Sequence, residues 1–204
     1  MCFISDTAKN QRSEKMKVIG LCGEIGAGKD VFADYLVRKK GYQKIVMSEV
    51  VTEELKKLKL PINREEMQKL SKEYKQKYGS GVWAKACVEY ARKQGFHRAV
   101  ISGIRDIEEV KLFRRELGKD FILVYITADT EVRYNRLIKR AGPKDPKILA
   151  DVKAQEAREQ EIFNLYNNFA EYADKRIVNN GMVVELFAAA DLLLKETGFQ
   201  SIKH

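Results

Sequence analysis

The sequence predicts an α/β fold in which a five-stranded parallel β-sheet has helices on both faces. Short apolar runs rich in β-branched residues alternate with longer segments whose apolar residues follow a helical period. Parallel strands need long right-handed crossovers, and the helical segments supply them. A chain of 204 residues, 45% of them hydrophobic, is long enough to bury one sizeable core.

The five apolar runs place the expected strands at 17–22, 44–47, 99–101, 121–126 and 176–178. The helical patterns place the main helices at 30–40, 64–78, 82–94, 107–117 and 131–140. Because strand and helix alternate, the chain is expected to fold as successive βαβ units.

One compact domain is expected over residues 17–204, with two excursions. Residues 1–16 are polar and patternless, so we expect a disordered tail, with Met16 as an alternative translation start. The stretch between the second and third strands holds more helix than one crossover needs, which predicts a helical acceptor lobe at about 49–95. The Ala-Gly-Pro sequence at Ala141 ends the preceding helix and predicts a short lid at about 140–155.

Composition narrows the function classes. A formal net charge of +9 favours anionic partners, but it does not choose among nucleotides, RNA and acidic surfaces. The three cysteines lack any C-x-x-C pair, so a disulfide framework or a zinc site is not indicated and a reducing cytoplasm fits best. No run reaches the roughly 18 apolar residues of a membrane span.

A phosphate-binding loop follows the first strand. The residues Gly23, Glu24, Ile25, Gly26, Ala27, Gly28 and Lys29 match the pattern G-x-x-x-x-G-K between a strand and an amphipathic helix. Glycines let the backbone approach phosphate oxygens, the helix start contributes N–H donors, and Lys29 supplies a positive charge. The loop therefore predicts binding of a nucleoside triphosphate, ATP or GTP.

The residues expected to hold Mg²⁺ depart from the usual pattern. Asp30 follows Lys29, where a Ser or Thr hydroxyl is usual, and Ser102 ends the third strand, where an acidic residue is usual. Our hypothesis is that carboxylate and hydroxyl have exchanged places, so that Asp30 and Ser102 still organise the metal. The alternative is that each change weakens metal binding independently.

The chain resembles the P-loop nucleoside-monophosphate kinase superfamily, which includes adenylate kinases and dephospho-CoA kinases. Within it, the chain is most similar to archaeal adenylate-kinase-related proteins of uncharacterised function. The similarity spans 17 to about 181, through the phosphate loop and the segments 46–51, 78–82, 102–105, 109–110 and 173–174.

The resemblance implies roles for several later residues. Arg105 would face the phosphate of the acceptor, while Arg136, Arg140 and Arg158 would close over the transferring group. Such roles suit arginine, because phosphoryl transfer spreads negative charge over oxygens that guanidinium groups can bind. Asn179, after the fifth strand, would lie against the donor nucleotide, although its loop also reads as a plain turn.

The acceptor side departs from the superfamily. Thr52 and Glu53 stand where an arginine for the monophosphate is usual, and Glu156 replaces an expected lid arginine. The sequence therefore does not identify the acceptor.

The expected function is that of a kinase transferring phosphate from ATP or GTP to a small phosphorylated acceptor, a nucleoside or deoxynucleoside monophosphate. The alternatives are dephospho-CoA kinase and a nucleotide-binding NTPase or regulatory protein that engages RNA or a protein. No membrane partner is expected.

Overall fold

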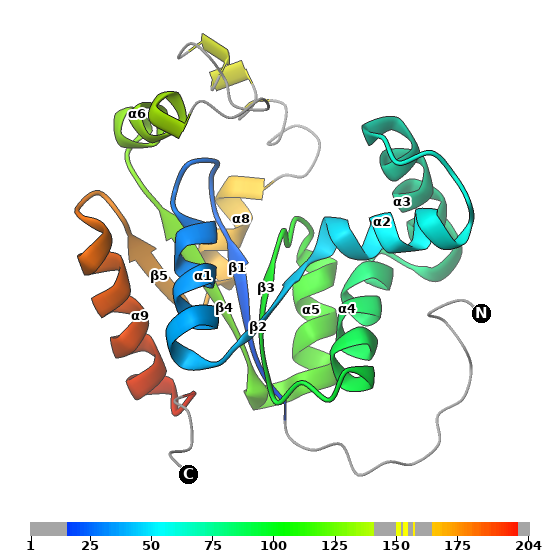
Figure 1. The fold of residues 1–204 in the computed structure, drawn as a ribbon, viewed down its shortest axis with the longest axis horizontal. Helices are drawn as coiled ribbons and strands as arrows, with labels where there is room; N and C mark the ends of the chain where they lie inside the picture. The colour runs from blue at the N-terminus through cyan, green and yellow to red at the C-terminus, as the bar shows by residue number, and fades with distance from the viewer. Residues whose placement is uncertain (1–15, 141–149, 152, 155–156, 158–164, 200–204) are drawn as a thin grey trace. The chain divides into compact units, whose positions relative to one another are not determined.

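The computed structural model describes residues 16–140, 150–151, 153–154, 157 and 165–199 (Figure 1). The strands are β1 (Lys17–Cys22), β2 (Gln43–Val46), β3 (Arg98–Ser102), β4 (Phe121–Thr127) and β5 (Lys175–Val178). The helices are α1 (Lys29–Lys40), α2 (Met47–Lys57), α3 (Arg64–Tyr78), α4 (Val82–Lys93), α5 (Ile107–Leu117), α6 (Thr130–Arg140), α8 (Leu165–Tyr172) and α9 (Val183–Thr197), with a 3₁₀ turn at Gly118–Asp120.

The five strands form one parallel sheet in the order β2-β3-β1-β4-β5 (Figure 1). The predicted fold class is confirmed, and each expected strand agrees with the observed one to within one residue at either end. The neighbours β2 and β3 align Gln43 with Ala99 and Val46 with Ser102. The neighbours β4 and β5 align Val124 with Lys175 and Thr127 with Val178.

The described residues group into two compact units, of which the first comprises residues 16–20 and Tyr42–Ile122. It contains β2, β3 and the helices α2 to α5, which pack on one another. Aromatic stacking consolidates its core: the rings of Tyr74 and Trp83 lie 5.1 Å apart, as do those of Phe113 and Phe121. Such pairs add about 0.5–1.5 kcal/mol each beyond the apolar area they bury.

The second unit comprises Leu21–Gly41 and the described residues from Leu123 to Phe199. Within it α1 packs against α9, where Tyr35 stacks on Phe187 with ring centroids 4.3 Å apart. The same contact carries a polar cluster, since the Tyr35 hydroxyl donates to Asp191 at 2.8 Å and Lys40 pairs with Asp191 at 2.7 Å. This packing fixes α1, and therefore the loop that precedes it.

Some of the observed helices were not predicted from the sequence. Helix α2 begins at Met47, directly after β2, and α8 and α9 were not among the expected helices. The expected tail lies outside the described residues except for Met16, which is buried. Most of the expected lid also lies outside them, so the domain boundaries, the lobe and the lid stay predictions.

Candidate functional site

The phosphate loop joins β1 to α1 with three glycines in backbone conformations that other residues rarely adopt. Gly23 has a φ of 132° and Gly28, the N-cap of α1, has a φ of 103°. A Cβ atom on Gly23 would collide with the carbonyl oxygen of Ile126 in β4, and one on Gly28 would collide with the side-chain amide of Asn179. Glycine is therefore required at both positions by the close packing of β4 and the β5–α9 loop.

The carbonyl oxygens of the loop are bonded to side chains of the second unit. Lys29 Nζ donates to the carbonyls of Gly23 and Glu24, each at 2.7 Å. The carbonyl of Ile25 accepts from Arg133 at 3.3 Å, and that of Ala27 accepts from the Asn179 amide at 2.8 Å. These bonds fix the loop backbone in the conformation of a phosphate cradle.

Arg133 connects the loop to α6 from a buried position. Besides the carbonyl of Ile25, its guanidinium donates to the carbonyl of Ala128 at 2.8 Å and to the Thr130 hydroxyl at 3.0 Å. Only 5% of Arg133 is exposed, so these bonds compensate the burial of its charge. Arg133 therefore belongs to the framework of the loop.

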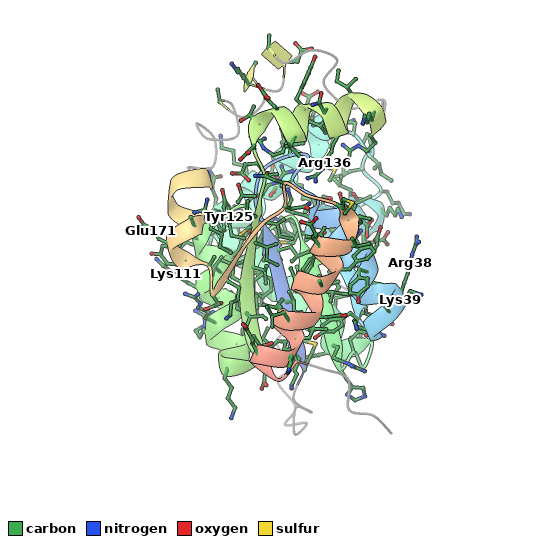
Figure 2. The ribbon with its side chains drawn as sticks, turned by 90° about the vertical axis from the view of Figure 1, so that its left-hand side faces the viewer. Arg38, Lys39, Lys111, Tyr125, Arg136 and Glu171 are labelled. Carbon is green, nitrogen blue, oxygen red and sulfur yellow. The ribbon has the colours of Figure 1, made fainter. Side chains whose placement is uncertain are left out.

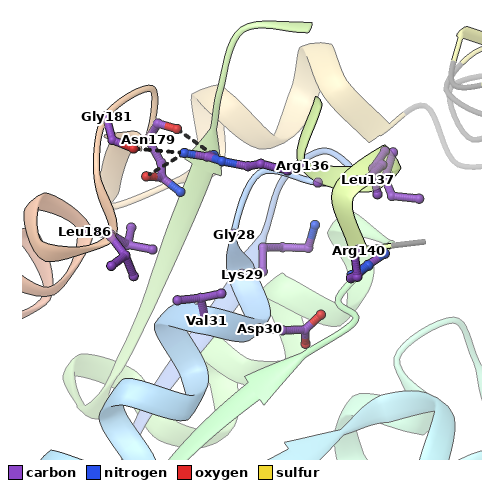
Figure 3. A pocket seen from close by; sticks show the side chains of 13 residues that line it. Gly28, Lys29, Asp30, Val31, Arg136, Leu137, Arg140, Asn179, Gly181 and Leu186 are labelled. Atoms are coloured by element: carbon purple, nitrogen blue, oxygen red, sulfur yellow. Dashed lines mark hydrogen bonds between the residues drawn. The ribbon is translucent and has the colours of Figure 1, made fainter. Parts of the chain in front are cut away.

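Arg136, one helical turn further along α6, holds the loop between β5 and α9. Its guanidinium donates to the carbonyls of Asn179 at 2.8 Å and Gly181 at 3.1 Å, and lies 3.5 Å from the side-chain oxygen of Asn179 (Figure 3). Asn179 in turn bonds the phosphate loop, so Arg136 supports that loop through Asn179. Figure 2 shows Arg136 at the same end of the unit as Tyr125.

Glu24 connects the loop to β4. One carboxylate oxygen, Oε1, accepts from the hydroxyl of Tyr125 at 2.6 Å and from that of Thr127 at 3.2 Å. Burial, and then the bond to Glu24, raises the pKa of Tyr125, so the phenol stays a donor at neutral pH. The other oxygen, Oε2, is buried and has no hydrogen-bond partner among the described residues.

A pocket of about 480 Å³ opens beside the loop (Figure 3), within the range of about 300–1,000 Å³ typical of small-molecule sites. All of its lining residues belong to the second unit. They are Ile25, Gly26, Gly28, Lys29, Asp30, Val31, Arg136, Leu137, Arg140, Asn179, Gly181, Val183 and Leu186. The lining combines three cationic side chains with an apolar side, which suits a ligand that has an anionic part and an apolar or aromatic part.

Comparison with known proteins agrees with this geometry. A family model of the AAA domain matches residues 19–164. A UPF0200 protein of Methanosarcina mazei is 32% identical over 144 residues, which are 71% of this chain and 76% of the relative. The chain belongs to the AAA domain family and to the UPF0200 family. The resemblance to uncharacterised archaeal P-loop proteins is thereby confirmed.

Two solved kinases resemble this UPF0200 chain in fold. A gluconokinase from Sinorhizobium meliloti superposes with a TM-score of 0.55 at 15% identity, over 94% of this chain and all of the kinase (100%). Shikimate kinase from Acinetobacter baumannii superposes with a TM-score of 0.53 at 17% identity, over 93% of this chain and 97% of the kinase. At such identities the likeness shows the fold alone, that of P-loop kinases, and does not identify a ligand or a reaction.

Most of the predicted donor-side residues of the UPF0200 chain meet at the pocket. The predicted residues Asn179, Arg136 and Arg140 all line it, together with Lys29 and Asp30. Gly23, Glu24 and Ala27 belong to the same loop without lining the pocket. Ser102 and Arg105 belong to the first unit, and Arg158 lies outside the described residues.

Arg133 and the apolar lining of the pocket were not predicted from the sequence. Arg133, Arg136 and Arg140 recur at helical spacing on α6, so the pattern itself indicated a third arginine on the same side of the helix. Val183 and Leu186 come from α9, which was not expected. Among the described residues, no helix has both the length and the apolarity that a bilayer span needs.

Proposed function

We propose that the protein is a phosphotransferase that moves the γ-phosphoryl group of ATP or GTP to a nucleoside or deoxynucleoside monophosphate. One observation carries the proposal: Lys29, Arg136 and Arg140 line one pocket at the phosphate loop. Phosphoryl transfer develops negative charge on the oxygens of the moving group, and catalysis depends on cations placed around them.

In the proposed reaction an oxygen of the acceptor's phosphate attacks the γ-phosphorus. The bond from that phosphorus to the β,γ-bridging oxygen breaks, which leaves ADP or GDP and an acceptor with one more phosphate. No side-chain nucleophile is needed, because the acceptor supplies the attacking oxygen. The contribution of the chain is to position the reactants and to stabilise the developing charge.

On the donor side, the loop amides and Lys29 would bind the β- and γ-phosphates. For this Lys29 exchanges its present partners, the carbonyls of Gly23 and Glu24, for phosphate oxygens. Arg140 lies at the end of α6 and is exposed, so its guanidinium can reach a phosphate in the pocket. Arg136 would take the same role only by giving up bonds to Asn179 and Gly181. Arg158 completes the proposed set.

Mg²⁺ fits the residues present. Asp30 brings one carboxylate to the pocket wall, and magnesium in nucleotide sites is typically held by one or two carboxylates together with the substrate phosphates. Within the described part of the chain, three or more His, Cys, Asp or Glu side chains do not cluster as a metal cage, so the phosphates would complete the ligand set. We assign the carboxylate of Asp30 to the ion, which would neutralise charge on the phosphates when bound. Ser102 belongs to the first unit, so its part in metal binding stays a prediction from the sequence.

On the acceptor side, we assign the acceptor's phosphate to Arg105. Its side chain is exposed on the first unit, at the end of the loop that follows β3. An exposed guanidinium on a loop that follows the carboxyl end of a parallel strand is suited to bind a phosphate.

The test is product analysis with labelled ATP or GTP and Mg²⁺. The acceptors are nucleoside monophosphates, deoxynucleoside monophosphates and dephospho-CoA, each compared with no acceptor. We expect label on a monophosphate with the wild type, loss of the product with Lys29→Ala, and its retention with Lys39→Ala. Lys39 is the matched control because it is an exposed lysine near the other end of α1 (Figure 2). Absence of any labelled acceptor would overturn the proposal.

One observation favours a nucleotide-dependent binding or regulatory protein instead. Glu53 pairs with Lys56 on its own helix, and the Thr52 hydroxyl donates to the carbonyl of Ser48, so the usual position of a monophosphate-binding arginine carries no cation. This rival expects nucleotide to bind and to hydrolyse at a rate that the acceptor panel does not change. Label on dephospho-CoA alone would favour the dephospho-CoA kinase alternative.

A further inference from the structure

Helix α9 presents an apolar stripe to solvent. Val184, Ala188 and Leu192 are all exposed, the two larger side chains to 59% and 56%. Because each is separated from the next by four residues, the three lie on one face of the helix. The opposite face carries the buried residues Leu186, Ala190, Leu193 and Leu194. Figure 2 shows α9 at the front of its unit, with its outer side uncovered by other described elements.

Further exposed apolar side chains lie beside this stripe. Met182 precedes α9 directly, and Val178 ends β5, which α9 contacts; both are mostly exposed. Monomeric soluble proteins rarely keep a large apolar patch in contact with water, and a helix that is apolar on every side is usually covered. We therefore expect another protein surface to cover the outer face of α9.

The order of residues along α9 suits pairing with a second copy of the same helix. Glu185 and Lys195 are exposed near opposite ends of α9 and are equidistant from Ala190 in the sequence. Ala188 and Leu192 are equidistant from Ala190 as well. Two copies of α9 that pack antiparallel about a twofold axis beside Ala190 therefore share one register for both pairs. That register places opposite charges together and a small residue opposite a large one, which lets helix surfaces interdigitate.

We propose that the protein forms a homodimer in which two copies of α9 pack antiparallel through Val184, Ala188 and Leu192. Glu185 then faces Lys195 of the partner subunit at both ends of the interface. A second copy is the partner that this face fits, because a twofold interface must be complementary to itself. Since α9 has only 15 residues, the interface is small, and we expect a Kd of the order of 10 µM.

Sedimentation equilibrium tests the proposal by measuring molecular mass against protein concentration over roughly 1 to 100 µM. The wild type is expected to change from monomer to dimer over this range. Leu192→Lys should raise the dimer Kd at least about tenfold, because it places a charge in the apolar stripe. The matched control is Ile62→Lys, since Ile62 is also 56% exposed but belongs to the first unit. This control should leave the dimer Kd within about twofold of the wild type.

Charge reversal tests the register of the two helices. Lys195→Glu and Glu185→Lys should each raise the dimer Kd about tenfold, because each places like charges against one another twice in a dimer. An equimolar mixture of the two variants should form a heterodimer with nearly the wild-type Kd, since both contacts of the mixed pair then join opposite charges. Salt at about 1 M should reduce the defect of each charge variant but not that of Leu192→Lys.

Glu185 needs a second variant because it also caps α9. Its Oε1 accepts the backbone N–H of Met182 at 3.4 Å. Circular dichroism of each variant therefore accompanies the mass measurement. If Glu185→Lys does not fold, Glu185→Gln keeps an oxygen for that N–H and removes the charge. The double variant Glu185→Gln/Lys195→Glu should then dimerise more tightly than Lys195→Glu alone, because the repulsion between like charges is gone.

The outcomes are decisive for the dimer and separate from the phosphotransferase, because the assay contains neither nucleotide nor acceptor. A wild type that stays monomeric at roughly 100 µM overturns the inference, and a different partner would then have to cover the stripe. A dimer that Leu192→Lys weakens no more than Ile62→Lys forms through another face and overturns it as well. Charge variants that are weakened singly but do not recover on mixing exclude the antiparallel register. Recovery on mixing supports it, because damage to the fold of α9 could not be repaired by a second damaged chain.

Discussion

The side-chain amide of Asn179 donates a hydrogen bond of 2.8 Å to the carbonyl oxygen of Ala27 in the phosphate loop. The same amide occupies the space that a side chain at Gly28 would need. Asn179 is 7% exposed and is itself held by Arg136. The residue that follows β5 is therefore part of the framework of the loop.

Replacing Asn179 should weaken nucleotide binding. Asn179→Ala leaves the carbonyl of Ala27 without its donor and is expected to reduce affinity for ATP or GTP about tenfold. Asn179→Asp should reduce the nucleotide affinity further, because a negatively charged carboxylate would face the carbonyl oxygen of Ala27. Isothermal titration calorimetry with the nucleotide checks both, and Asn180→Ala, one residue further along, is the control. Equal affinities for Asn179→Ala and Asn180→Ala would show that the bond is unimportant for binding.

Two substitutions of Glu24 should change the nucleotide affinity in opposite directions. Glu24→Gln keeps an oxygen for the hydroxyls of Tyr125 and Thr127 and removes a negative charge from a loop that binds phosphates. Nucleotide affinity should rise about threefold at low salt and less at high salt. Glu24→Ala loses both bonds and should lower affinity and melting temperature. If the Gln variant binds more weakly than the wild type, the charge of Glu24 is needed for more than holding the loop.

Arg133 should be important for stability. Arg133→Met leaves the carbonyls of Ile25 and Ala128 without a donor in a buried place, and we expect a loss of about 3 kcal/mol in the free energy of unfolding. Urea denaturation measures it, with Lys139→Met, an exposed lysine on the same helix, as the control. A loss no larger than in that control would mean that the carbonyls find other donors.

The buried thiol of Cys22 should make the stability of the protein depend on pH in the alkaline range. Burial raises the pKa of its thiol from the ordinary value of 9.0 to about 12, with a smaller opposing effect of Lys29. The unfolded thiol loses its proton at lower pH than the folded one, so the stabilisation is complete below pH 9.0 and is lost as pH rises towards 12. The difference in unfolding free energy between the wild type and Cys22→Ala should shrink over that window. A constant difference would show that the folded thiol titrates normally.

The strands and the phosphate loop were predictable because their signals are local. The run Lys17–Cys22, the glycines after it and Lys29 lie within a few residues of one another, and each agrees with the same structure. Helix α9 was missed, although Gly198 ends it in a left-handed conformation typical of helix C-caps. Its exposed apolar residues, such as Val183 and Val184, obscure the usual division into an apolar and a polar face.

The partners of the site could not be predicted, because they are set by contacts distant in sequence. Arg136 and Asn179 were each assigned to a ligand, yet the structure bonds them to each other across 43 positions. A sequence pattern shows that an arginine on α6 can face a site, but not whether its guanidinium meets a phosphate or a backbone carbonyl. The ion pair between Lys75 on α3 and Glu109 on α5 could likewise not be predicted, because in the sequence each residue looks like a charge on a helix surface.

The side-chain bonds to the loop carbonyls have a kinetic consequence. A loop whose backbone is already held by Arg133, Asn179 and Lys29 has little conformational freedom left to lose when an anion arrives. Capture of the phosphates should then be limited by diffusion and by the exchange of partners at Lys29, not by ordering of the loop. Different nucleotides should therefore associate at nearly the same rate, and their affinities should differ mainly in how long each stays bound.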